Sequence, residues 1–151
     1  MCNVEFKFSV QWPPEFPRPL SGFELGDLTI TGSNGTVTSG SDPRMSMMVF
    51  LSCTLLLDGV RAFFTNRTAR TYRFGAIDSS FGILFARNKE QRIVISVDEQ
   101  CIAVVSPKML QQALLLAADD LLTTAFCYLP EDDTARRDLK AATALFKTME
   151  L

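Results

Sequence analysis

Carboxylates are the main candidates for chemistry in this sequence, because its 151 residues include 17 Asp and Glu but no histidine. Without histidine, the Ser-His-Asp and Cys-His catalytic pairs and the His-containing zinc sites are excluded. Two carboxylates can act as general acid and base when their environments separate their pKa values. The candidate pairs are Asp78 with Asp98 and Asp119 with Asp120. Because neighbouring helix residues diverge by about 100°, Asp119 and Asp120 are not expected to face one site.

Cysteine chemistry has weak support from the spacing of the thiols. The four cysteines are Cys2, Cys53, Cys101 and Cys127. They form no C-x-x-C pair and no metal knuckle, so they are typical of a reduced, cytoplasmic protein. Cys53 and Cys127 sit among apolar residues, where a free cysteine behaves as a small buried hydrophobe.

The remaining polar motifs favour structure over catalysis. The peptide GAIDSSFG lacks the G-x-S-x-G elbow, so we expect a turn in which Asp78 or Ser79 bonds its own backbone. No glycine pair matches a dinucleotide fingerprint or a P-loop. Glu131-Asp132-Asp133 lacks the spacing of a calcium loop and is better explained as the start of a helix. We therefore expect no cofactor and no metal.

The charges are distributed unevenly along the chain. Residues 61–92 contain seven basic side chains against Asp78 and Glu90, a balance of +5. Residues 98–133 contain seven acidic side chains against Lys108, a balance of −6. These stretches could face each other or water, or the acidic one could be a docking surface for a basic partner. The overall charge of −2 argues against nucleic-acid binding.

The first elements expected from the pattern are strands and an apolar helix. Alternation predicts a strand over residues 4–10, then a proline-rich loop, WPPEFPRPL, and a strand over residues 23–30 with a bulge at Gly26-Asp27. Trp12, at the start of this loop, could be an interface residue or a cover for the edge of the core. Asn34-Gly35 predicts a tight turn into residues 36–38. Ser41 or Asp42, followed by Pro43, predicts the start of a helix that continues to residue 64 in the middle of the fold.

The pattern of the second half of the chain predicts a meander of strands followed by two helices. Short strands are expected over residues 72–76, 81–85, 93–97 and 101–105, with Asp98-Glu99 as a tight turn. Apolar stripes predict amphipathic helices over residues 107–127 and from about residue 131 onward. The fold class is therefore α+β, with an antiparallel β-meander sheet packed on one face by about three helices, in a single domain over residues 1–151.

No membrane association is expected from the sequence. The longest nearly apolar run, residues 47–57, is 11 residues long and contains Ser52 and Thr54. A membrane-spanning helix needs roughly 20. The first residues also lack the basic and apolar regions of a signal peptide.

Several segments, taken in order, resemble the small cytoplasmic immunity proteins that accompany bacterial polymorphic toxins. They are FKFSV, DLTITGSNGTVTS, MMVFLSCTLLLDGVR, YRFGAIDSSFGILFARN and RRDLKAAT. The resemblance is one of pattern and order, and it transfers no residue roles. It implies a protein that binds a cognate toxin domain, covers its active site and performs no chemistry, as a monomer or weak homodimer.

Five acidic residues at predicted element ends are the candidate contacts with such a toxin. They are Asp98, Glu99, Glu131, Asp132 and Asp133. An acidic inhibitor surface can occupy a nucleic-acid or nucleotide site by charge mimicry. Two other classes stay open: an adaptor or chaperone for a secreted effector, with an exposed apolar patch, and a small enzyme that uses carboxylate or cysteine chemistry.

Overall fold

The computed structural model describes residues 3–16 and 18–151, so Cys2 lies outside the described residues. Its strands are β1 (Val4–Val10), β2 (Leu25–Gly32), β3 (Gly35–Thr38), β4 (Met47–Met48), β5 (Thr71–Gly75), β6 (Gly82–Arg87), β7 (Ile93–Val97) and β8 (Gln100–Val105). Its helices are α1 (Val49–Thr65), α2 (Pro107–Ala125) and α3 (Thr134–Lys147). Short 3₁₀ turns cover Ser39–Ser41, Pro43–Met45 and Phe126–Tyr128. No helix in the described part of the chain is long and apolar enough to cross a membrane.

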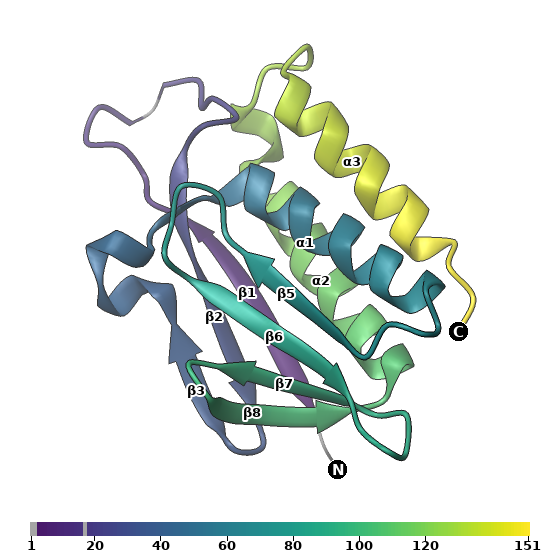
Figure 1. Ribbon diagram of the computed structural model, residues 1–151. Coiled ribbons are helices and arrows are strands. Elements are labelled where there is room, and N and C mark those ends of the chain that lie inside the picture. The colour runs from purple at the N-terminus through teal and green to yellow at the C-terminus, as the bar shows by residue number, and fades with distance from the viewer. Residues whose placement is uncertain (1–2, 17) are drawn as a thin grey trace.

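The predicted α+β fold with antiparallel strands and three helices is confirmed (Figure 1). The strands are divided between two four-stranded sheets. In the first sheet, β1, β2 and β3 lie in that order and β4 pairs with β2. The second sheet is the predicted meander, β5-β6-β7-β8.

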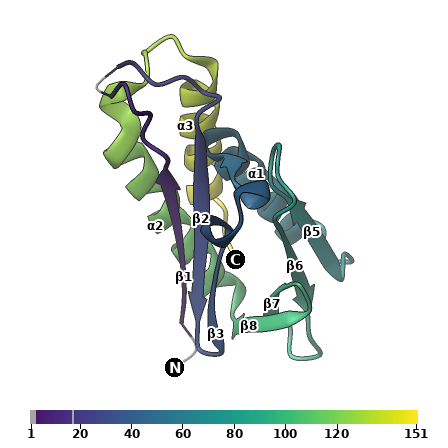
Figure 2. The same ribbon diagram turned by 90° about the vertical axis from the view of Figure 1, so that its left-hand side faces the viewer.

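The two sheets meet where β8 approaches β2 and β3, at the lower end of Figure 2. The Asn34 N–H donates a hydrogen bond of 3.0 Å to the Ile102 carbonyl oxygen across this junction. Gly32 is required here because a Cβ atom at this position would collide with the same carbonyl oxygen. The close approach of two backbones therefore joins the sheets.

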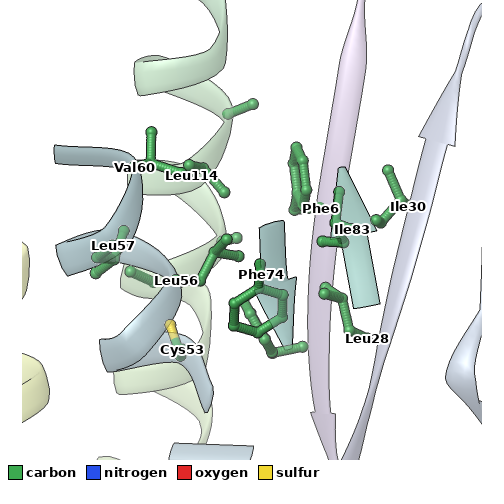
Figure 3. Packing of buried hydrophobic residues seen from close by; sticks show 14 of the residues in the cluster. Phe6, Leu28, Ile30, Cys53, Leu56, Leu57, Val60, Phe74, Ile83 and Leu114 are labelled. Carbon is green, nitrogen blue, oxygen red and sulfur yellow. The ribbon is translucent and has the colours of Figure 1, made fainter. Parts of the chain in front are cut away.

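Helix α1 lies in the middle of the fold, as its apolar sequence predicted. It packs against α3 on one side and β5 on the other, while α2 lies beside β1. Figure 3 shows Leu56 and Val60 of α1 directed into the same core as Leu114 of α2 and Phe6 of β1. Burial of each such side chain contributes about 1.5–3 kcal/mol.

Two local predictions in the first sheet and the helix that follows it are wrong. There is no bulge at Gly26-Asp27, because β1 and β2 pair in continuous register through Val10 and Gly26. The apparent slip arose from Phe23 and Leu25, which are apolar but exposed and belong to the solvent side of the strand and its preceding turn. An exposed apolar residue carries no information about the buried face.

The helix does not begin at Pro43. The Asp42 side chain does cap the turn after it, accepting the Arg44 N–H at 2.9 Å, but the turn is a 3₁₀ segment that ends at Met45. Met47 and Met48 then pair with β2, so α1 begins only at Val49. Pairing with a distant strand has overridden the local helix signal.

The packing of α1 on β5 generates a stability prediction at Gly59. A Cβ atom on Gly59 would overlap the ring and hydroxyl of Tyr72, whose ring is held by stacking on Phe85 at 5.9 Å. Gly59→Ala should lower the free energy of unfolding by about 1–2 kcal/mol, because overpacking outweighs the gain in helix propensity. The measurement is urea unfolding.

Gly75→Ala is the matched control, because open space surrounds the added methyl group. It should change the free energy of unfolding by less than about 0.5 kcal/mol. A Gly59→Ala variant as stable as the parent would contradict the tight α1–β5 contact.

Candidate partner-binding surface

The five acidic residues proposed from the sequence do not form one surface. Asp98 and Glu99 are exposed in the β7–β8 turn, with φ values of 48° and 66°. Both values suit a two-residue hairpin turn, so the predicted tight turn is confirmed. Residues 131–133 lie in the loop before α3, at the top of both Figure 1 and Figure 2, whereas the β7–β8 turn lies near the bottom of both.

Asp133 has a structural role at the start of α3. Its carboxylate accepts the Arg136 N–H at 3.0 Å and thereby caps the helix. The same carboxylate accepts the Gly22 N–H at 3.2 Å. Asp133 therefore confirms the interpretation of this acidic run as a helix start, and it also attaches a distant loop to that helix.

Glu131 and Asp132 are the acidic residues of this group that a partner can reach. Both are exposed. Within the described residues, neither side chain has a hydrogen bond or an ion pair. Their negative charge is therefore uncompensated and directed to solvent.

An aromatic cluster includes Tyr128, which precedes these acids in the chain. It consists of Trp12, Phe16 and Tyr128, whose ring centroids are 4.8, 5.3 and 5.0 Å apart in pairs. Trp12 is 45% exposed and Phe16 is 37% exposed, so both present part of their rings to solvent. Phe23, 69% exposed, lies on the same loop, residues 11–24. Three exposed aromatic side chains on one loop are unusual for a solvated surface and typical of an interface.

Sequence reasoning singled out Trp12 but missed Phe16, Phe23 and Tyr128. The available signal was the occurrence of aromatic residues among prolines, in a segment whose pattern assigns them to no buried face of a strand or helix. The signal for Tyr128 was weaker, because its position depends on where α2 ends.

Ion pairs and hydrogen bonds brace loop 11–24. Arg18 pairs with Glu15 at 3.0 Å and with Glu24 at 2.9 Å. The pKa of Glu15 is lowered, because its carboxylate accepts hydrogen bonds from its own backbone N–H and from Arg18. The buried Leu20 donates its N–H to the Tyr128 carbonyl oxygen at 2.7 Å. These contacts attach the described part of the loop to Glu24 and to the segment that follows α2.

A cavity of about 380 Å³ adjoins the aromatic cluster. Its lining includes Arg18, Pro19, Cys127 and Leu129. Cys127 is exposed, so the prediction that it is buried is wrong. The reason is that α2 ends at Ala125 and a 3₁₀ turn follows, which takes Cys127 off the apolar stripe. Cys53 is buried as predicted, and burial raises the pKa of its thiol.

The basic stretch does not cover the acidic one. Arg61 pairs with Asp58 at 3.8 Å within α1. Arg87 and Arg92 donate to backbone carbonyl oxygens. Within the described residues no ion pair joins the side chains of residues 61–92 to those of residues 98–133, so the two stretches face water separately.

The other candidate chemistry is distributed over separate elements. Asp119 and Asp120 are exposed on α2, where Asp120 borders a groove of about 640 Å³ beside β1. Asp78 lies in the β5–β6 turn with a φ of 57°. Ser79 forms the predicted turn, accepting the Phe81 N–H at 3.0 Å. No group of three or more Cys, Asp or Glu in the described part of the chain could hold a metal ion.

Comparisons with protein-family models, curated proteins and solved structures found no match to this chain. The chemistry of its own surface therefore carries the functional argument.

Within the described residues Asp133 is bonded and its neighbour Asp132 is not, and this difference generates a stability prediction. Asp133→Ala should lower the free energy of unfolding by about 1 kcal/mol, because it removes a helix cap and the bond to Gly22. Asp132→Ala, which removes the same charge one residue earlier, should have an effect below about 0.5 kcal/mol. Thermal or urea unfolding measures both. Equal effects of the two variants would show that Asp133 does not anchor the loop.

Proposed function

We propose that this protein is an immunity-type inhibitor that binds a protein toxin domain and covers its active site. The contact surface is a partner surface made of Trp12, Phe16, Phe23, Glu131 and Asp132. The observation that carries the proposal is the exposure of aromatic side chains on a loop that is bonded to the segment with the unpaired carboxylates. The resemblance in segment order to immunity proteins supports the same class.

The aromatic residues supply the affinity in this proposal. Trp and Tyr are enriched at interface hot spots, where truncation of one such side chain costs about 2 kcal/mol or more. Ordering a flexible side chain on binding costs about 0.5–1.5 kcal/mol. Loop 11–24 avoids part of this cost, because Arg18 and Leu20 already fix its backbone.

The carboxylates supply the orientation and the rate of association. Exposed Glu131 and Asp132 attract a basic surface, such as the active site of a toxin that acts on nucleic acid or nucleotides. We leave Asp98 and Glu99 out of the partner surface, because they lie at the other end of the molecule. Asp133 contributes indirectly, since its carboxylate is committed to α3 and Gly22.

The exposed aromatic residues also favour a second candidate, an adaptor or chaperone for a secreted effector. Such a protein binds mainly through apolar contacts, and the exposure of Phe23 fits that role. The two candidates differ in their electrostatics. Inhibition of a basic active site depends on Glu131 and Asp132, whereas an apolar escort is insensitive to them.

Charge reversal tests which end of the molecule contacts the toxin domain. In the proposed complex with a cognate toxin domain, Glu131→Lys with Asp132→Lys should slow association at low salt by about tenfold or more. The control is Asp98→Lys with Glu99→Lys, which changes charge equally at the other end and should leave the rate unchanged. Stopped-flow association kinetics provide the measurement. A larger effect of the control pair would move the contact surface to the β7–β8 turn.

Truncation of the aromatic residues tests the source of affinity. Trp12→Ala and Phe16→Ala should each weaken binding of that toxin domain about 30-fold, mainly through faster dissociation. Leu145→Ala is the control, because Leu145 is an exposed apolar residue on α3, outside the partner surface. Surface plasmon resonance measures both rates. Wild-type affinity of both aromatic variants would exclude this loop as the binding site.

A further inference from the structure

A second hollow, of about 420 Å³, lies where the end of α1, the β6–β7 turn and the start of α2 come together. In Figure 1 these segments lie near the C-terminal end of the chain, far from loop 11–24. Three basic side chains line the hollow: Arg67, Arg87 and Lys108. Phe64 supplies an apolar wall and Glu150 the one carboxylate side chain among the lining residues. We call this hollow the basic pocket.

The positive charge of the basic pocket is not neutralised by the protein. Within the described residues none of the three cations forms an ion pair, either with Glu150 or with any other acidic side chain. The three cations face two carboxylates, the Glu150 side chain and the terminal carboxylate of Leu151, which leaves a balance of +1 at the pocket. Unpaired like charges in one hollow repel each other, and an anion bound there relieves that repulsion.

Arg87 is the fixed member of the group. It donates to the Phe63 carbonyl oxygen at 2.8 Å and to the Ala69 carbonyl oxygen at 3.1 Å, and its guanidinium lies 4.5 Å from the Phe63 ring centroid. These contacts occupy Nη2 and Nε and leave Nη1 without a partner in the described residues. The pKa of Arg87 is lowered by partial burial and by the neighbouring Arg70 and Arg67. Positive charge is thus crowded here around a rigid guanidinium whose Nη1 N–H donors have no partner in the described residues.

The start of α2 adds a backbone donor. Ser106 accepts the Met109 N–H at 3.2 Å with its hydroxyl and the Leu110 N–H at 3.1 Å with its carbonyl oxygen. The N–H of Lys108 has no such partner in the described part of the chain. A free first-turn amide and the helix dipole both favour negative charge beside Lys108.

We propose that the basic pocket binds a small phosphorylated molecule, with the phosphate group held between Arg67, Arg87 and Lys108. The excess of positive charge attracts a phosphate group, and Arg side chains match its oxygens in geometry. The hollow is of the size of ordinary small-molecule sites, so the rest of the ligand has room to lie against Phe64. This site goes beyond the proposed inhibition and is separate from the partner surface.

Titration of the full-length protein with defined probes tests the proposal. The probes are inorganic phosphate, adenosine monophosphate and uncharged adenosine, followed by amide chemical shifts in NMR at neutral pH and low salt. Phosphate and adenosine monophosphate should give saturable shifts confined to the residues of the basic pocket, and adenosine should give none. Absence of saturable shifts with both phosphorylated probes would overturn the proposal.

Matched variants locate the site without disturbing Arg87, which also packs on the core. Arg67→Ala and Lys108→Ala should each weaken adenosine monophosphate binding about tenfold, the loss of one charge-assisted hydrogen bond. Arg73→Ala is the control, because Arg73 is an exposed arginine on β5 outside the pocket, and it should have no effect. An equal loss of affinity in all three variants would indicate nonspecific surface attraction and would overturn the proposed site.

A single-stranded oligonucleotide distinguishes a free phosphorylated molecule from the phosphates of nucleic acid. The proposal predicts that it binds no more tightly per phosphate than adenosine monophosphate does. An affinity that increases steeply with strand length and depends on Arg73 would contradict a small-molecule site.

Discussion

The hydrogen bond from the Leu20 N–H to the Tyr128 carbonyl oxygen, 2.7 Å long, holds together two loops from opposite halves of the chain. The buried Leu20 side chain and the bond from Gly22 to Asp133 secure the same attachment. Without these contacts, loop 11–24 would be a solvated proline-rich segment whose aromatic side chains move independently. Fixing each backbone residue on binding would then cost about 1–2 kcal/mol. The proposed partner surface therefore depends on an intramolecular attachment made before binding.

Helix α3 connects the two surfaces proposed for this protein. Its capping residue, Asp133, anchors loop 11–24, and Glu150, just beyond its last turn, lines the basic pocket. A helix of 14 residues is about 21 Å long, so the two surfaces are separated by several Debye lengths at high salt and about two at physiological salt. The near-zero net charge of the chain conceals this separation. Negative charge is exposed beside the aromatic cluster, and positive charge is collected at the far end of α3.

Local patterns predicted much of the fold, because alternation and turn chemistry act over a few residues. The strand over residues 4–10, the tight turn at Asp98-Glu99 and the helix start at residues 131–133 were predicted this way and are found in the structure. The start of α1 was wrong because the pairing of Met47 and Met48 with β2 is a long-range interaction that no local signal contains. The division of the strands between two sheets depends on similar long-range packing at Gly32.

The candidate site was less predictable than the fold. Charge runs indicated residues 131–133 correctly as an element end, but a charge run cannot show that Asp133 is bonded and Asp132 is free. The aromatic cluster joins Trp12 and Phe16 to Tyr128, which lies in the other half of the sequence. Exposure of an aromatic residue is decided by what the rest of the fold leaves uncovered, and composition alone does not contain that information.

Titration of toxin activity tests the central claim of inhibition by direct coverage most directly. The proposed cognate toxin domain is mixed with increasing amounts of the protein, and its catalytic rate is measured at toxin concentrations above the dissociation constant. Inhibition by coverage predicts that activity falls linearly and reaches zero at one equivalent. Full toxin activity in the presence of excess protein would contradict the account.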